Sequence, residues 1–358
     1  MENGTFKWSL IGASGIAESS IVPAILAQAN TGIASIVSSS LGRAASLASA
    51  AGAAALDDID TALSDPSVDA VYISSVNSSH YEQTLAAIKA GKHVMCEKPL
   101  ALTAKEAVAM AEAARDAGVL LATNHHMRNS VPHEFIRRAI AHGDLGTIVG
   151  ASVRHAVELP NSAQGWRTEN PEAGAGVILD ITVHDADVLR YVLDSDPETV
   201  YARARSGAMT AAGIDESVIG VAHFADGTDV SFFESFISGH ANTELSVFGT
   251  EASLVGVGIQ SMQPVGSLFR VVDGEATPID LGRREDLYTV GFRRFQAASQ
   301  DREERPAATA EDGIWSLAFA EAALRSVQSD NAEPVRYPGR PTPQSYAALQ
   351  EAEWKISD

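Results

Sequence analysis

Short apolar runs and helix-like segments alternate through the first third of the chain. The runs, rich in β-branched residues and predicted as strands, cover residues 6–11, 33–38, 70–75, 93–96 and 120–124. Apolar residues recur at helical spacing over 81–90 and 104–117, and a glycine that can end a helix follows each segment. Strands that are apolar on both faces and alternate with helices predict a doubly wound parallel sheet.

The pattern changes after residue 129, where polar and apolar positions alternate in longer segments joined by short turns. Segments 216–225 and 228–236 flank Asp226-Gly227, and segment 268–272 precedes Asp273-Gly274. Because Asp-Gly is typical of a type I′ hairpin turn, both pairs predict antiparallel strands. A third hairpin is predicted for residues 243–255. We therefore expect an open, mainly antiparallel sheet of roughly half a dozen strands.

Helical spacing returns near the end of the chain, over 287–298 and 312–327. The proline-dotted stretch 334–343 is predicted to wrap the surface before one short helix. The fold class expected is therefore α/β, with a parallel-sheet domain over 1–124 and an α+β domain over 125–358. The broad face of the second sheet could serve homo-oligomer formation.

Composition narrows the class of partner. Among 358 residues, 26 Lys and Arg stand against 46 Asp and Glu, which gives a formal charge of −20. Nucleic acid and anionic membranes are therefore excluded as expected partners, because both are negatively charged. The single cysteine, Cys96, rules out an intramolecular disulfide, and no apolar run approaches the length of a membrane span. The first residues lack the pattern of a secretion signal, so a cytoplasmic location is expected.

A glycine turn follows the first predicted strand. Residues 12–17 read Gly-Ala-Ser-Gly-Ile-Ala, close to the G-x-G-x-x-G/A fingerprint of a dinucleotide-binding Rossmann unit. Ser14 stands where the fingerprint has its second glycine, and its hydroxyl could donate to a pyrophosphate. Because the turn lies between a strand and a helix at the start of a βαβ array, we predict that it binds a dinucleotide.

The end of the second strand predicts which nicotinamide cofactor is preferred. The stretch 38–43 contains three serines and Arg43 but no carboxylate. An acid there would bind the ribose 2′-hydroxyl of NAD, whereas hydroxyls and a guanidinium suit the 2′-phosphate of NADP. We therefore predict NADP(H), with Ser38 and Arg43 at the phosphate. The alternative is that Arg43 is a solvated residue at the start of the next helix.

Two further motifs carry candidate chemistry. Lys98 is followed by proline at the end of the fourth strand, which restricts its backbone and raises the odds of a cis peptide bond. A lysine at this edge can polarise a carbonyl or transfer a proton. Asp180 and His184 stand four residues apart in a predicted helix, so the carboxylate could orient the imidazole. Either Lys98 or His184 could be the proton donor.

Three histidines after the fifth strand invite a different interpretation. His125, His126 and His133 could suggest a metal site, but no cysteine or convergent acid accompanies them. We therefore expect no metal. Cys96, inside a strand, is expected to be a buried apolar residue.

Together these motifs resemble the superfamily of glucose–fructose oxidoreductase, inositol dehydrogenase and rhizopine-catabolism proteins (Gfo/Idh/MocA). The resemblance rests on WSLIGASGIA (8–17), GKHVMCEKPL (91–100), TNHHMRN (123–129), GWR (165–167) and GVILDITVHDAD (176–187). It implies that Lys98 and His184 are catalytic, supported by Asp180. It also implies a cofactor site lined by Gly12, Ser14, Gly15, Ile16, Ala17, Ser38, Arg43, Ser75, Asn77, His80, Glu97, Lys98, Asn124, Trp166 and Arg167.

The activity that the resemblance implies is NADPH-dependent reduction of a cyclic ketosugar, 1,5-anhydro-D-fructose, to 1,5-anhydro-D-mannitol. One alternative is a dehydrogenase that oxidises another sugar, an anhydrosugar or a cyclitol with the same residues. A second alternative is a sugar or nucleotide sensor of the same fold without catalysis. The presence of Lys98, Asp180 and His184 counts against the sensor.

Overall fold

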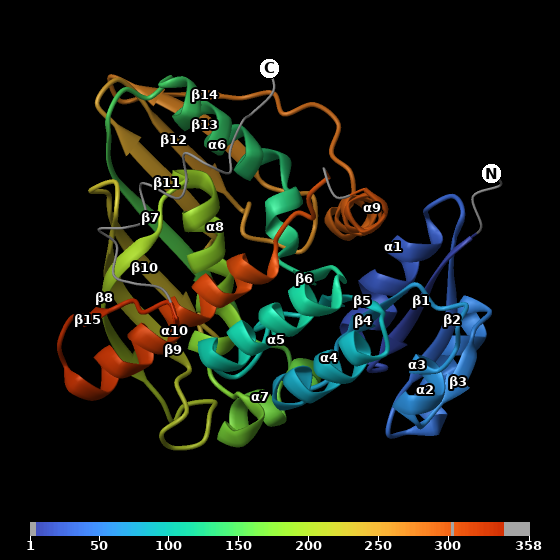
Figure 1. Cartoon of the computed structure of the whole chain (residues 1–358). Helices are drawn as coiled ribbons and strands as arrows, with labels where there is room; N and C mark the ends of the chain where they lie inside the picture. Colours follow the sequence, from blue (N-terminus) through green and yellow to red (C-terminus); the bar gives the residue numbers. More distant parts are fainter. Residues whose placement is uncertain (1–4, 302–303, 340–358) are drawn as a thin grey trace.

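The computed structural model describes residues 5–301 and 304–339, and Figure 1 shows two sheets side by side with helices packed on and between them. The first sheet has six parallel strands in the order β3-β2-β1-β4-β5-β6. The strands are β1 (Phe6–Ile11), β2 (Thr31–Val37), β3 (Ala54–Leu56), β4 (Ala70–Ile73), β5 (His93–Cys96) and β6 (Leu121–Thr123). The expected doubly wound parallel sheet is confirmed.

Helices cover both faces of this sheet. They are η1 (Ala17–Ile21), α1 (Val22–Leu26), α2 (Leu41–Ala51), α3 (Ile59–Leu63), η2 (Asn77–Ser79), α4 (His80–Lys89) and α5 (Ala104–Ala117). Helix α5 begins with a capping box between Thr103 and Glu106 and ends at Gly118, whose φ of 68° allows the left-handed turn. Strand β3 was not expected from the sequence, because Ala54-Ala55-Leu56 is too short and too alanine-rich to carry a strand pattern.

The second sheet has nine strands in the order β14-β13-β12-β11-β7-β10-β9-β8-β15. They are β7 (Ile148–Ala156), β8 (Pro197–Arg205), β9 (Ser217–Phe224), β10 (Asp229–Ser235), β11 (Glu244–Gly249), β12 (Ser253–Val257), β13 (Ser267–Val272), β14 (Glu275–Pro278) and β15 (Glu333–Pro334). Every described pair is antiparallel except β10 with β7. The sheet is mainly antiparallel, as expected, but larger than the half dozen strands predicted.

The two Asp-Gly turns differ from each other. Asp273 and Gly274 both have positive φ, 51° and 82°, as a type I′ turn requires. In the β9–β10 hairpin only Gly227 has positive φ, and its N–H donates to the carbonyl of Phe224. This hairpin is therefore a type I turn followed by a glycine bulge, and the type I′ prediction at Asp226-Gly227 was wrong. The β9–β10 connection has one residue more than a two-residue type I′ turn, and this residue forms the bulge.

The remaining helices link the two sheets. They are η3 (His126–Asn129), α6 (Val131–His142), η4 (Asn161–Ala163), α7 (Trp166–Glu169), η5 (Pro171–Ala173), η6 (Ile178–Thr182), α8 (Val183–Leu193), α9 (Leu287–Gln300) and α10 (Ala310–Ser329). The predicted tail continues past the described residues, and the short helix expected after it lies outside them.

Helix α9 returns from the second half of the chain to the first sheet (Figure 1). Phe292 and Phe295 pack against Trp8 of β1, with ring centroids 4.9 and 5.1 Å away, and all three side chains are buried. Helix α10 packs on α5 of the first domain and on β8 of the second sheet. The predicted domain boundary between residues 124 and 125 separates the two sheets. Helix α9 belongs to the second domain in sequence but packs on the first sheet, so this boundary stays a proposal.

One face of the second sheet carries exposed apolar side chains. Ile219 and Val221 are 59% and 53% exposed, although they lie on strand β9 inside the sheet, and their spacing of two residues puts both on the same face. Homo-oligomer formation through this sheet stays a prediction.

Candidate active site

The glycine turn lies where the strand order of the first sheet reverses, between β1 and β4. Gly12 has a φ of 112°, and a Cβ there would lie 2.8 Å from the backbone of Ser74 and Ser75. Gly15 is exposed, and a Cβ there would meet nothing within 4 Å. The turn is thus closely packed against β4 at its first glycine and open at its second. An open turn at a switch point fits the pyrophosphate of a dinucleotide.

The hydroxyl of Ser14 is bound within the protein. It donates to the Oγ of Ser74 at 2.9 Å and accepts from the backbone N–H of Ala17 at 3.2 Å. This bond fixes the turn against β4, and the expected contact of Ser14 with a pyrophosphate stays a prediction. Of the other turn residues, Ile16 is partly buried and Ala17 fully buried.

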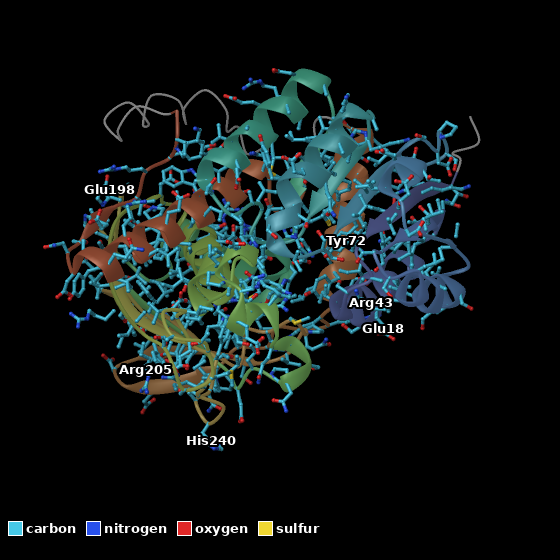
Figure 2. The ribbon with its side chains drawn as sticks, turned by 90° about the horizontal axis from the view of Figure 1, so that it is seen from below. Glu18, Arg43, Tyr72, Glu198, Arg205 and His240 are labelled. Carbon is cyan, nitrogen blue, oxygen red and sulfur yellow. The ribbon has the colours of Figure 1, made fainter. Side chains whose placement is uncertain are left out.

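The residues expected at the NADP phosphate follow the carboxyl end of β2. Ser38 is buried, and its Oγ accepts from the backbone N–H of Ser40. Arg43 stands in the first turn of α2 and is exposed, and Figure 2 shows it at the surface of the first domain. An exposed guanidinium beside a strand end that carries no acid leaves room for a phosphate.

The carboxyl end of β4 contributes three of the expected cofactor residues. Ser75 donates to Gln83 at 2.6 Å, and Asn77 donates to the carbonyl of Gly174 in the second domain at 3.3 Å. His80 is fully buried, with Nδ1 2.8 Å from the carbonyl of Pro99 and Nε2 3.2 Å from that of Ser75. Both ring nitrogens face backbone carbonyls, so His80 helps to hold the Lys-Pro turn, and its expected place at the cofactor stays a prediction.

Glu97 lies in a polar cluster under the sheet edge. Its Oε1 accepts from Nδ2 of Asn124 at 2.7 Å and from the hydroxyl of Tyr72. Tyr72 is buried in the first sheet (Figure 2). Burial raises the pKa of the Glu97 carboxyl, although Tyr72 and Lys98 act in the opposite direction. Glu97 and Asn124, expected at the cofactor, therefore lie together beside Lys98.

Lys98 joins the first domain to the second. Its peptide bond to Pro99 is cis, as the sequence suggested. Its Nζ donates to the backbone carbonyl of Asp180 at 2.6 Å and to Oδ1 of the same residue at 2.9 Å. Arg167 also donates to this Oδ1, at 3.4 Å, and its guanidinium lies 4.4 Å from the ring centre of Trp166. Four residues predicted from three separate motifs therefore meet at one place.

The charge of Asp180 is stabilised at this meeting point. Burial alone would raise the pKa of its carboxyl, but the positive charges of Lys98 and Arg167 outweigh burial and hold it below its usual value. The acid is therefore ionised at neutral pH and fixes the position of the Lys98 amine.

His184 lies in a group of histidines next to Lys98. Its ring centre is 5.2 Å from that of His126, 6.2 Å from that of His125 and 6.3 Å from that of His155. Burial lowers the pKa of His184 well below the usual value, and the positive charge of Lys98 lowers it further. The imidazole is therefore neutral at neutral pH.

Asp180 and His184 are not paired as the sequence suggested. Asp180 lies in the π-helical turn η6, and α8 begins only at Val183. The Asp180 carboxylate contacts Lys98 and Arg167 instead, while the buried Nδ1 of His184 has no hydrogen-bond partner among the described residues. The wider π turn changes the relative direction of the two side chains, so an i,i+4 argument does not apply.

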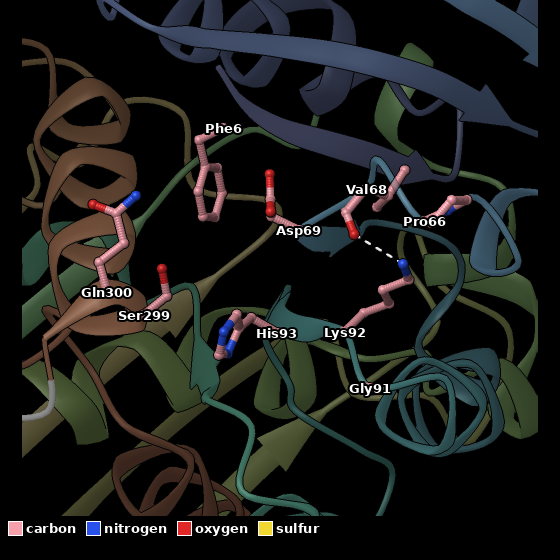
Figure 3. Close-up of a pocket in the computed structure, with 9 residues that line it drawn as sticks. All are labelled: Phe6, Pro66, Val68, Asp69, Gly91, Lys92, His93, Ser299 and Gln300. Atoms are coloured by element: carbon pink, nitrogen blue, oxygen red, sulfur yellow. Dashed lines mark hydrogen bonds between the residues drawn. The ribbon is translucent and has the colours of Figure 1, made fainter. Parts of the chain in front are cut away.

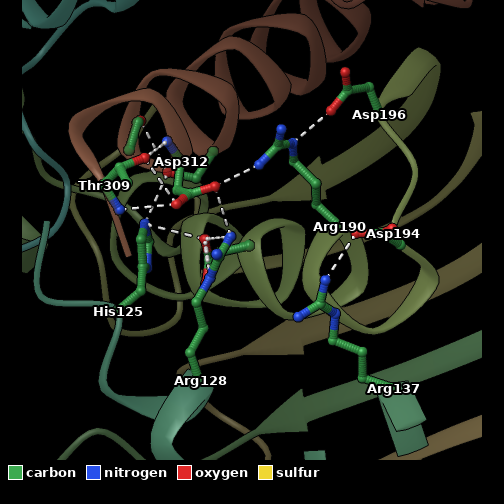
Figure 4. A network of polar contacts seen from close by, with 11 residues as sticks. His125, Arg128, Arg137, Arg190, Asp194, Asp196, Thr309 and Asp312 are labelled. Atoms are coloured by element: carbon green, nitrogen blue, oxygen red, sulfur yellow. Dashed lines mark hydrogen bonds and ion pairs between the residues drawn. The ribbon is translucent and has the colours of Figure 1, made fainter. Parts of the chain in front are cut away.

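Sequence reasoning missed how the TNHHMRN segment is used. His126 stacks on Tyr288 of α9 at 4.9 Å and meets His184 edge to face. Arg128 binds Asp187 through three hydrogen bonds of 2.8–3.1 Å and lies 3.0 Å from Asp312 of α10. Figure 4 shows this network of acids and guanidinium groups between α8 and α10. The position of the segment directly after β6, at the carboxyl edge of the sheet, was the signal available.

The arrangement of the histidines was also compared with that of a metal site. Over residues 5–301 and 304–339, no group of three or more His, Cys, Asp or Glu side chains is arranged to hold a metal ion. Cys96 is fully buried, and burial raises the pKa of its thiol, so it is an inert core residue as expected.

A hollow of about 410 Å³ lies at the opposite edge of the first sheet (Figure 3). Phe6, Asp69 and His93 line it from the amino ends of β1, β4 and β5, and Lys92 donates to the carbonyl of Val68 at 2.8 Å. Ligands of open α/β sheets bind beyond the carboxyl ends of the strands. This hollow is therefore separate from the candidate active site.

Two family models match this chain. Residues 6–125 match the family model of oxidoreductases with an NAD-binding Rossmann fold, and residues 133–255 match the GFO/IDH/MocA C-terminal domain. The chain belongs to the Gfo/Idh/MocA oxidoreductase family. The resemblance seen in the sequence is thus confirmed, and with it the Rossmann domain and an NAD(P)-dependent oxidoreductase.

One curated relative matches over nearly its whole length. A 1,5-anhydro-D-fructose reductase of Ensifer adhaerens is 44% identical over 332 residues, which are 92% of this chain and 98% of the relative. Other relatives include an inositol 2-dehydrogenase of Saccharopolyspora erythraea, 30% identical over 88% of this chain and 91% of its own. These named activities, all on sugars or cyclitols, support a sugar oxidoreductase.

Solved structures of low sequence identity share the fold. An aldose–aldose oxidoreductase from Caulobacter crescentus, solved with glycerol, superposes with a TM-score of 0.84 at 20% identity, covering 92% of this chain and 99% of its own. A 3-ketoreductase from Actinomadura kijaniata, solved with TDP-benzene and NADP, has a TM-score of 0.79 at 21% identity, covering 90% and 98%. Among the helices of the described residues, none has the length and apolarity needed to cross a membrane.

Proposed function

We propose that the protein reduces a cyclic ketosugar, 1,5-anhydro-D-fructose, to 1,5-anhydro-D-mannitol with NADPH. The observation that carries the proposal is the ion pair between Lys98 and Asp180, at the carboxyl edge of the Rossmann sheet and next to the neutral imidazole of His184. The choice of sugar is supported by the relative from Ensifer adhaerens, which is 44% identical to this chain over 332 residues.

The preference for NADPH rests on the end of β2. Arg43 is exposed there, Ser38 lies beside it in the chain, and no carboxylate in the stretch 38–43 would repel a phosphate. The pyrophosphate would lie on the open turn at Gly15, and Glu97 and Asn124 would lie on the nicotinamide side of the cofactor. When bound, the dihydronicotinamide supplies the hydride for the carbonyl carbon of the sugar.

Lys98 is the proton donor in this proposal. Asp180 takes two of the hydrogen bonds that the Lys98 ammonium group can donate, through its carboxylate and its backbone carbonyl. The third N–H remains for the carbonyl oxygen of the substrate, which it polarises and then protonates as negative charge develops. His184, being neutral, is better suited to accept a hydrogen bond from a sugar hydroxyl than to donate a proton.

Residues of the second domain close the site. Trp166 and Arg167 stack on each other, and Arg167 also binds Asp180, so the segment 166–167 is tied to the carboxylate that holds Lys98. We propose that this segment covers the reacting groups and keeps water from them.

The proposal is tested by mixing the purified protein with NADPH and a panel of cyclic ketosugars and following the loss of nicotinamide absorbance. We expect turnover with 1,5-anhydro-D-fructose and a product that co-elutes with 1,5-anhydro-D-mannitol and not with its glucitol epimer. Faster NADP⁺ reduction by an anhydrosugar or cyclitol would instead favour the dehydrogenase. Cofactor binding without turnover on every sugar would favour the sensor.

Replacing Arg43 by alanine tests the cofactor preference. A hydrogen bond to a charged group contributes about 1.5–3 kcal/mol, so the KM for NADPH should rise about 10- to 100-fold. The KM for NADH should stay within about twofold, because NADH has no 2′-phosphate, and it serves as the internal control. Unchanged NADPH kinetics in Arg43→Ala would mean that Arg43 is only a solvated surface residue.

A further inference from the structure

Two buried acids lie behind the histidine group and have no part in the proposed reaction. Glu234, on β10, is 0% exposed, and Asp185, the residue after His184 in α8, is 1% exposed. A charged carboxylate is costly to bury unless it is paired or hydrogen-bonded. Their surroundings therefore indicate which of the two is charged.

Each acid uses one oxygen and leaves the other without a partner. Oδ1 of Asp185 accepts from Nε2 of Gln260 at 2.7 Å and lies 3.0 Å from Nδ1 of His155. Oε2 of Glu234 accepts from the hydroxyl of Thr182 at 2.9 Å. Oδ2 of Asp185 and Oε1 of Glu234 are both buried, and no donor reaches either of them from the described residues.

Glu234 of β10 stands opposite His155 of β7 in the sheet, and His155 contacts Asp185, so a single proton shared by the two acids would satisfy both oxygens. Asp185 acts on Glu234 directly, and burial together with the negative charge of Asp185 raises the pKa of Glu234 well above its usual value. Two adjacent carboxylates in a dry site cannot both be ionised. Oδ1 of Asp185 has two nitrogen neighbours, Nε2 of Gln260 and Nδ1 of His155, whereas Oε2 of Glu234 has only the Thr182 hydroxyl, so Glu234 is the acid better placed to carry the proton.

We propose that Glu234, Asp185 and His155 form a relay in which protonated Glu234 donates to Asp185, and Asp185 holds His155 with its Nε2 free to accept a hydroxyl of the sugar. His155 is a binding residue in this proposal, and the two acids are positioning residues. The role of His155 toward the sugar rests on the proposed function, whereas the proton on Glu234 does not.

The surroundings of His155 fit this role. Its side chain comes from β7, is 12% exposed, and its ring centre lies 6.3 Å from that of His184. Because Nδ1 faces the Asp185 carboxylate, Nδ1 carries a proton, and a ring that holds only this one proton has its lone pair on Nε2. The other titratable groups around it are His126 from η3, His184 from α8 and, through Gln260, His133 from α6.

Infrared spectroscopy tests the proton on Glu234 without any substrate. At neutral pH the wild-type protein should show the carbonyl stretch of an un-ionised carboxyl group, and Glu234→Gln should lose that band. The matched control is Glu251→Gln, at an exposed glutamate, which should leave the band unchanged. A wild-type spectrum without the band, or one whose band survives in Glu234→Gln, would overturn the relay.

Nitrogen NMR of histidine-labelled protein tests the tautomer. His155, assigned by the signals that disappear in His155→Gln, should carry its proton on Nδ1 at neutral pH. A proton on Nε2 would contradict the relay even if the infrared band is present. Neither measurement needs turnover, so both remain informative if the protein reduces no ketosugar.

Kinetics test the contact with the sugar. His155→Phe keeps a ring of similar size but removes the Nε2 acceptor, so KM for the ketosugar should rise about tenfold, with the Kd of NADPH within twofold of wild type. His155→Gln, which can still accept a hydrogen bond, should recover part of the loss. A tenfold change in NADPH binding, or equal KM values for all three proteins, would show that His155 does not bind the sugar. Absence of turnover in the wild type would count against the proposed function and leave the spectroscopic tests standing.

Discussion

Lys98→Met should lower kcat for reduction of 1,5-anhydro-D-fructose by about 10²- to 10⁴-fold, the contribution usually made by a general acid. The amine is the charged donor fixed at 2.6 and 2.9 Å on Asp180, and the neighbouring imidazole of His184 is neutral and cannot replace it. The measurement is steady-state turnover at saturating NADPH, with the Kd of NADPH determined by fluorescence in the same variant.

Two further variants show whether a loss of kcat in Lys98→Met comes from the missing proton donor. Lys105→Met makes the same chemical change at an exposed position on α5 and should leave kcat unaltered. Lys98→Arg keeps the positive charge but holds its proton too tightly to transfer it, so kcat should stay low. If Lys98→Arg were nearly as active as the wild type, the role of Lys98 would be electrostatic and proton donation would come from elsewhere. A Lys98→Met enzyme with more than a tenth of wild-type turnover would remove Lys98 from the mechanism.

Regular local patterns predicted most of the first sheet. The bounds of β1, β5 and α5 agree with those expected, because each combines a mainly apolar run or helical spacing with a clear end signal. Strand β3 lacks such a pattern and exists because Ala54–Leu56 pairs with the edge of β2. Long-range pairing of this kind leaves no trace in a three-residue window.

The sequence motifs predicted which residues gather at the site, but not which of their side chains contact each other. Lys98, Asp180, Arg167 and Trp166 come together as their separate motifs suggested. The predicted contact between Asp180 and His184 does not form. Asp180 lies in a π-helical turn, where residues four apart do not face each other as they do in an α-helix. The roles of His155 and Glu234 were invisible, since they lie on strands far apart in the chain and reach Asp185 only through the folded second sheet.

The network around Arg128 shows the same dependence on tertiary structure, and it carries the largest expected effect on stability. Arg128→Met should lower the free energy of unfolding by about 3–5 kcal/mol, the cost of leaving a buried charge without its partner. Asp187 is 1% exposed and receives three hydrogen bonds from Arg128, and Asp312 is also buried. Burial would raise the pKa of Asp312, but the charges of Arg128 and Arg190 hold it below its usual value.

Chemical denaturation of the apoprotein measures this loss, and Arg115→Met is the matched control. Arg115 pairs with Asp116 on the surface, where both side chains are more than 70% exposed, so its removal should change stability by less than about 0.5 kcal/mol.

A second substitution separates an unpaired charge from lost packing. Adding Asp187→Asn to Arg128→Met removes the carboxylate that the first change left alone, so the double variant should be more stable than Arg128→Met itself. If the two losses simply added, the damage would come from the missing methylene contacts of Arg128. The network of Figure 4 would then act by packing, and the charge on Asp187 would contribute little to holding η3 against α8.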